Sequence, residues 1–72
     1  MATMDLRGVC CPTNFAKAKL ALEMADPGDL LVLYLDDGEP AANVSRSISQ
    51  EGHVLLGMEK EDGFWVLTVQ KT

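Results

Sequence analysis

The sequence has few basic residues and no apolar stretch long enough to cross a membrane. Only 6 of its 72 residues are Lys or Arg, against 11 Asp or Glu, and the net charge is -5. Nucleic-acid binding depends on clustered cations that neutralise phosphates. This composition therefore argues against DNA, RNA or an anionic lipid surface as the main partner. The longest apolar run, residues 30–35, is far shorter than the ~20 residues of a membrane helix.

Cysteine and histidine are also scarce. The two cysteines, Cys10 and Cys11, are adjacent, and His53 is the only histidine. The first residues, MATMDL, lack the basic start and apolar core of a secretory signal, so we expect a cytoplasmic protein. Because cytoplasmic thiols stay reduced, the cysteines do not predict a structural disulfide. Their spacing from His53 is not that of a zinc site, and we expect no metal site.

The length fits one domain, which we expect to span residues 1–72. A domain of this size buries only about 60% of the surface that its unfolded chain exposes. Such a core supports a fold and one shallow site and rarely encloses a large cofactor, so we expect no cofactor. With 47% hydrophobic and 24% charged residues, the composition is that of a folded protein.

The first half of the chain predicts a strand, a helix and a second strand. Residues 2–6 predict a short strand, after which Gly8 permits a turn. Cys11-Pro12 predicts a helix start, because proline is favoured at the first helical position. Residues 26–29, DPGD, predict the helix end. The apolar run 30–35 then predicts a central strand. Within the helix, one apolar stripe is expected from the helical spacing of four residues: Phe15, Ala18, Leu22 and Ala25.

The second half predicts a helix and a hairpin. Residues 36–40 break the preceding strand, and the helical face formed by Ala41, Val44 and Ile48 leads to a C-terminal glycine, Gly52. A turn at Asp62-Gly63 joins two alternating segments, whose apolar residues are Val54, Leu56 and Met58 before it and Trp65, Leu67 and Val69 after it. The order β-α-β-α-β-β predicts an α+β two-layer sandwich, a mixed four-stranded sheet with two helices on one face.

One sheet face would then lack a helical cover. Some apolar residues must lie on it, from the set Leu30, Val32, Tyr34, Leu55, Phe64 and Val66. Such a face fits either a partner or dimer surface or scattered surface hydrophobes.

The motifs resemble those of the TusA/SirA-like family of small sulfurtransferases. They are DLRGVCCP at residues 5–12, PGD at 27–29, the apolar strand, DD at 36–37 and EGHVL at 51–55. The resemblance covers essentially the whole chain and implies the β-α-β-α-β-β sandwich. It also implies that Cys11, the cysteine before proline, carries sulfur as a persulfide. The sulfur would come from a donor protein, such as a cysteine desulfurase or a rhodanese, and pass to an acceptor protein.

The site implied by this resemblance is Cys11 with a supporting turn and helix start formed by Gly8, Pro12, Thr13 and Asn14. The family pattern is usually Cys-Pro-x-Pro, and here Asn14 replaces the second proline. The loop that begins Asp36-Asp37 also departs from the usual Asp-Asp-Pro. Both departures suggest a subgroup with its own donor or acceptor.

The predicted position of Cys11 suits a reactive thiol. Unpaired N–H groups at a helix start stabilise an anion by roughly 0.3–2 kcal/mol, which would lower a thiol pKa from about 8.5 to about 7.5. The acidic net charge opposes this shift. The alternative is that Cys11 is a small buried hydrophobe. Cys10 is either incidental or a second sulfur-accepting thiol.

Other candidate residues have plain structural alternatives. Lys17 and Lys19 form a solvated helix face or attract an anionic sulfur group, and His53 is interpreted as a junction residue. The carboxylates of residues 36–39 form a solvated turn or bind a cation. A rival function for the whole chain is a redox-responsive regulatory binding module that uses Cys10, Cys11 and the open sheet face.

Overall fold

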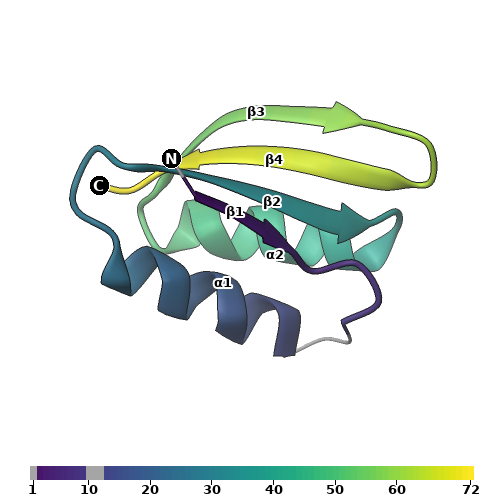
Figure 1. Cartoon of the computed structure of the whole chain (residues 1–72), viewed down its shortest axis with the longest axis horizontal. Helices are drawn as coiled ribbons and strands as arrows, with labels where there is room; N and C mark the ends of the chain where they lie inside the picture. Colours follow the sequence, from purple (N-terminus) through teal and green to yellow (C-terminus); the bar gives the residue numbers. More distant parts are fainter. Residues whose placement is uncertain (1, 10–12) are drawn as a thin grey trace.

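The computed structural model describes residues 2–9 and 13–72. It contains six elements, shown in Figure 1: β1 (Ala2–Asp5), α1 (Thr13–Met24), β2 (Leu30–Asp36), α2 (Glu39–Gln50), β3 (Val54–Lys60) and β4 (Phe64–Gln70). The predicted order of strands and helices is confirmed. Neither α1 nor α2, in the part of the chain that is described, has the length and apolar character needed to span a membrane.

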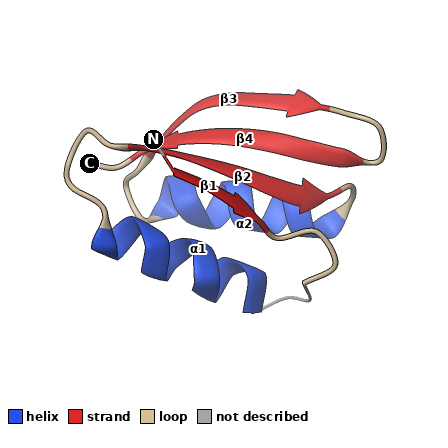
Figure 2. Cartoon of the chain, viewed as in Figure 1, coloured by secondary structure: helices blue, strands red, loops and turns tan. Residues whose placement is uncertain are grey.

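The four strands form one mixed sheet in the order β1-β2-β4-β3. β1 pairs with β2 in parallel, and β4 pairs antiparallel with both β2 and β3. Both helices lie against the same face of this sheet (Figures 1 and 2). The structure therefore confirms the predicted α+β two-layer sandwich.

The core lies between the sheet and the helices. Alternate residues of β2 and β4 point into it, because side chains along a strand alternate between the two faces. The buried apolar residues of the core are all aliphatic, and they are Leu6, Ala18, Leu22, Leu31, Leu33, Leu35, Ala41, Val44, Ile48, Leu67 and Val69. Of the predicted α1 stripe, Ala18 and Leu22 are buried, whereas Phe15 and Ala25 are half-buried.

The two ends of α2 follow ordinary capping rules. The helix begins at Glu39, so Pro40 belongs to its first turn and not to the break that was predicted for residues 36–40. Proline is tolerated there because its missing N–H would have had no intrahelical acceptor. At the other end Gly52 has φ +91°. The N–H groups of Gly52 and His53 donate to the carbonyls of Ser49 and Ile48, which is a Schellman motif.

The predicted apolar face of β3 was wrong. Val54, Leu56 and Met58 are 42%, 53% and 37% exposed, whereas Leu55 packs against the core. The pairing with β4 shifts register between Leu55 and Gly57, as in a β-bulge. The regular alternation of side chains between the two sheet faces therefore does not continue through β3.

The open face of the sheet carries half-buried apolar residues. They are Leu30, Val32, Tyr34, Phe64 and Val66, which alternate with the core residues along β2 and β4. The rings of Tyr34 and Phe64 meet edge to face at 5.7 Å. Five of the six candidates for this face therefore lie on it, and Leu55 does not.

Candidate functional site

The candidate site lies in the segment that joins β1 to α1. Gly8 has φ +80°, which confirms the predicted turn, because this left-handed conformation favours glycine. The described chain stops after Val9 and resumes at Thr13. Cys10, Cys11 and Pro12, and with them the predicted helix start, lie outside the described residues.

Two hydrogen bonds attach the beginning of this segment to β2. The N–H of Leu6 donates to the carbonyl of Tyr34 at 2.8 Å, and the Leu6 side chain is buried in the core. The N–H of Gly8 donates to Oδ2 of Asp36 at 2.8 Å. From the sequence, Asp36 was interpreted as part of a solvated turn or a cation site. In the structure its carboxylate instead accepts a hydrogen bond from Gly8, a residue 28 positions away in the sequence.

An ion pair lies beside this segment. Arg7 Nε and one terminal nitrogen donate to Asp5 Oδ1 and Oδ2 at 2.9 and 2.7 Å. These hydrogen bonds lower the pKa of the Asp5 carboxyl to about 2 and raise the pKa of Arg7. The guanidinium carbon also lies 4.6 Å from the ring centre of Phe64 and 5.4 Å from that of Tyr34. Arg7 therefore covers the aromatic end of the open sheet face.

The first described turn of α1 contains an exposed and a buried polar residue. Thr13 is exposed, whereas the side chain of Asn14 is fully buried. Asn14 lies four residues before Ala18 and eight before Leu22, so it belongs to the buried face of the helix. Its Oδ1 accepts the N–H of Phe15 at 2.7 Å. The sequence interpretation placed Asn14 at the helix start but missed its burial, which this spacing would have indicated.

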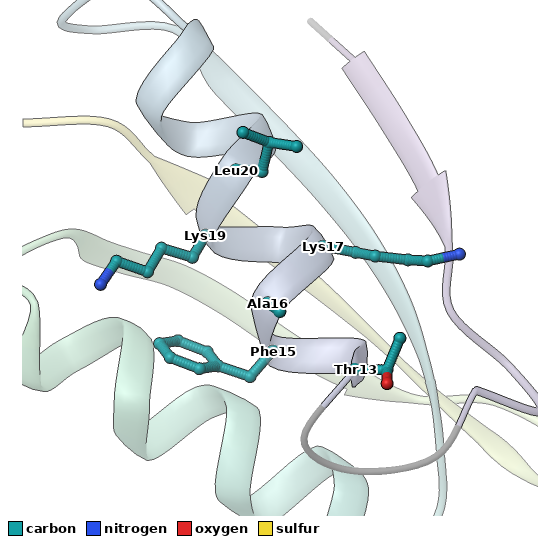
Figure 3. Close-up of a pocket in the computed structure, with 6 residues that line it drawn as sticks. All are labelled: Thr13, Phe15, Ala16, Lys17, Lys19 and Leu20. Carbon is teal, nitrogen blue, oxygen red and sulfur yellow. The ribbon is translucent and has the colours of Figure 1, made fainter.

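A shallow hollow of about 460 Å³ lies along the first half of α1. It is open to solvent and mostly apolar, and the residues that line it are Thr13, Phe15, Ala16, Lys17, Lys19 and Leu20 (Figure 3). Leu20 is 57% exposed, and Met24, one helical turn later, is 79% exposed. The hollow begins two residues after Cys11 in the sequence.

The two lysines of α1 project to opposite sides of the helix (Figure 3). Lys19 Nζ lies 3.0 Å from Glu51 Oε1, and this hydrogen bond raises the lysine pKa. The pair links α1 to the residue that follows α2. Lys17 is exposed on the side toward β1. Lys19 therefore forms an ion pair on the exposed surface of the helix, and neither of the two interpretations of these lysines had included such a pair.

The turn before α2 supplies a second carboxylate with partners in the fold. Asp37 Oδ1 accepts the indole N–H of Trp65 at 2.7 Å, and Asp37 Oδ2 lies 3.3 Å from Lys60 Nζ. These contacts, the Trp65 hydrogen bond first, lower the pKa of Asp37. Among the described residues, no group of three or more His, Cys, Asp or Glu side chains is arranged to hold a metal ion.

His53 lies between α2 and β3, as predicted for a junction residue. Its Nδ1 accepts the backbone N–H of Thr72 at 3.3 Å, and the hydroxyl of Thr72 donates to the carbonyl of Gly52 at 2.9 Å. These contacts give His53 a role in holding the C-terminal residue.

The sequence and the fold of this chain are similar to those of several known proteins. The family model described as sulfurtransferase TusA matches residues 2–71. A candidate sulfur carrier protein of Archaeoglobus fulgidus is 36% identical over an alignment of 69 positions that covers 94% of this chain and 78% of that protein. Another, from Neisseria meningitidis serogroup A, is 37% identical over 94% of this chain and 92% of its own. The crystal structure of a SirA-like protein from Desulfitobacterium hafniense superposes with a TM-score of 0.82 at 27% identity, covering 97% of this chain and 96% of that one.

Proposed function

The chain belongs to the TusA family of sulfurtransferases, and on this premise we propose that it is a sulfur carrier that holds sulfur as a persulfide on Cys11. The relatives named as candidate sulfur carrier proteins support this role. The observation that carries the assignment to Cys11 is its position two residues before Thr13, the first described residue of α1. A helix start has unpaired N–H groups, and in this proposal they support the sulfur of Cys11.

The proposed chemistry is an exchange of one sulfur atom between two thiols. The Cys11 thiolate attacks the outer sulfur of a persulfide on a donor protein. A new S–S bond forms on Cys11, the donor's S–S bond breaks, and the donor cysteine leaves as a thiolate. In the second transfer an acceptor nucleophile takes the outer sulfur, and the Cys11 thiolate is the leaving group. Neither transfer requires an external oxidant or reductant.

The helix start supports the anions of this exchange. Its N–H groups and the helix dipole favour negative charge by roughly 0.3–1 kcal/mol at an exposed position. A modest lowering of the thiol pKa is sufficient, because the best attacking thiol has a pKa near the ambient pH. The Gly8–Asp36 hydrogen bond supports the same role, since it fixes the chain two residues before Cys10.

The partners in this proposal are a donor protein, such as a cysteine desulfurase or a rhodanese, and an acceptor protein. The hollow beside the first half of α1 is open and shallow. Such a surface is accessible to a partner protein that presents a sulfur atom. We propose that the carrier works in the cytoplasm, where thiols stay reduced.

Intact mass measurement tests the assignment. After incubation with a cysteine desulfurase and cysteine, the wild-type protein should gain about 32 Da, one sulfur atom, as expected of a reactive thiolate. Cys11→Ser should abolish this gain, and Cys10→Ser, the matched control at the neighbouring thiol, should retain it. A sulfur adduct that persists in Cys11→Ser and disappears in Cys10→Ser would assign the carrier role to the other cysteine.

A further inference from the structure

The two helices differ in what they expose to solvent. The exposed side of α2 carries polar residues such as Arg46 and Gln50. The exposed side of α1 carries Ala16, Leu20 and Met24, which recur every four residues and therefore form one apolar stripe. Leu20 is 57% exposed and Met24 is 79% exposed. Since the opposite side of α1 packs on the core, this helix is apolar on both sides, which is typical of a helix that is covered on both.

The stripe is complementary in size to a second copy of itself. Many packed helices lie about 20° from antiparallel. If two copies of α1 meet in this way at Leu20, Ala16 of one copy lies level with Met24 of the other, because each is four residues from Leu20. The small Ala16 side chain lines the hollow of about 460 Å³ (Figure 3). A methionine side chain is flexible enough to fill such an irregular space.

The charges beside the stripe are complementary in the same arrangement. Lys17 precedes Leu20 by three residues, and Glu23 follows it by three, and both are exposed. Antiparallel pairing therefore brings Lys17 of each copy level with Glu23 of the other. In the part of the chain that is described, neither side chain belongs to an ion pair. Opposite charges that meet across an interface fix its register, so these residues favour the antiparallel arrangement.

The charge of α1 also suits contact between two copies. The net charge of the chain is -5, so two copies repel each other overall. α1 contains two lysines, Lys17 and Lys19, and a single acidic residue, Glu23. Contact through this locally basic helix therefore avoids the like-charge repulsion that other surfaces would cause.

We propose that the protein forms a two-fold symmetric dimer through the exposed stripe of α1, with the two helices antiparallel and Leu20 at the axis. One helix from each copy is a small contact compared with the roughly 1,200–2,000 Å² of stable interfaces, so the dimer is reversible. The contact uses described residues alone and does not depend on the sulfur chemistry. Dissociation exposes the hollow again, so a partner protein and a second copy would occupy the same surface in turn.

Sedimentation equilibrium over a range of protein concentrations tests the dimer. A reducing agent is present throughout, so that Cys10 and Cys11 cannot link two copies. The apparent mass should rise with concentration from 7.8 kDa toward twice this value. Leu20→Ser should raise the dissociation constant about tenfold or more, because both copies lose an apolar contact. Leu56→Ser, the matched control at an exposed leucine of β3, should leave it unchanged.

Charge reversal tests the antiparallel register. Lys17→Glu should raise the dissociation constant a few-fold, because it brings a carboxylate level with Glu23 of the second copy. Glu23→Lys should do the same by bringing two lysines together, and the double variant should restore dimerisation. Arg46→Glu changes the net charge by the same amount on the exposed side of α2 and should have little effect. Circular dichroism verifies that each variant is folded.

The outcomes separate this dimer from other contacts and from the carrier proposal. A mass of 7.8 kDa at every concentration would overturn the dimer. Dimerisation that is lost in Leu56→Ser and kept in Leu20→Ser would assign the contact to β3 and reject α1. A double charge variant that stays as weak as the single variants would reject the antiparallel register. None of these results bears on sulfur uptake by Cys11, which the intact mass measurement tests.

Discussion

The two faces of the sheet use the same strands in different ways. On the helix-covered face, Leu33, Leu35 and Leu67 are completely buried. On the open face, the alternating residues Val32 and Val66 are only half-buried. The apolar run at residues 30–35 therefore reflects two environments, a closed core and a second surface that side chains only partly shield.

The open face nevertheless has a cover at one end. The Arg7 guanidinium lies over the rings of Tyr34 and Phe64, and Asp5 holds the guanidinium through two hydrogen bonds. Stacked cations are stabilised by aromatic rings even at exposed sites. The segment that leads to Cys11 therefore also shields part of the sheet. Substitutions on both faces test how differently the two faces contribute to stability.

The largest effect is expected on the covered face. Leu33→Ala should lower the free energy of unfolding by about 2–5 kcal/mol, because it removes buried methyl groups and leaves a cavity. Such a loss is a large share of the stability of a small domain. Urea unfolding followed by circular dichroism measures the change. A loss below that of the open-face variant described next would contradict the assignment of the core to this face.

The neighbouring residue on the open face is the matched comparison. Val32→Ala should cost about 1 kcal/mol or less, because the side chain is already partly hydrated in the folded state. The same urea titration applies. If Val32→Ala proves as damaging as Leu33→Ala, then the open face is covered in solution, and the protein concentration dependence of the midpoint would show whether a second copy covers it.

The smallest effect is expected from the ion pair, and it depends on pH. The folded-state pKa of Asp5 is about 2, below its ordinary 3.8. A lowered pKa means that the contribution is fully present above the ordinary value and is lost as the pH falls through the folded value. Asp5→Asn should therefore flatten the decline of the urea midpoint in this acidic interval.

Arg7→Gln is the control for that prediction, since it removes the partner that lowers the Asp5 pKa. It should flatten the same interval, and the double variant should add little to either single change. Single variants whose midpoints fall with pH as steeply as that of the wild type would show that the pair makes no contribution in solution.

The sequence predicts the fold well where periodicity is uninterrupted. The run 30–35 predicts β2, and the spacing of Val44 and Ile48 predicts α2, because each pattern is set by contact with a single core. The prediction fails in β3, where the bulge between Leu55 and Gly57 changes which residues face the core. Its only sign in the sequence is a glycine within a strand, which also has other causes.

The candidate site was only partly predictable. Gly8 adopts the turn conformation expected of it, and the role of Cys11 remains a prediction. The contact between Gly8 and Asp36 was not foreseen, because it joins two segments that only the parallel pairing of β1 and β2 brings together. The burial of Asn14 was missed because a polar residue does not contribute to an apolar stripe.

The bulge has a consequence for the outer edge of the sheet. β3 is an edge strand with one neighbour, and a regular edge would offer its free N–H and carbonyl groups to a strand from another molecule. An irregular backbone and exposed charges discourage such addition. β3 has an irregular backbone at the register shift after Leu55, and it has exposed charges at Glu59 and Lys60. The register shift thus interrupts the edge of the sheet at which a strand from another molecule would add.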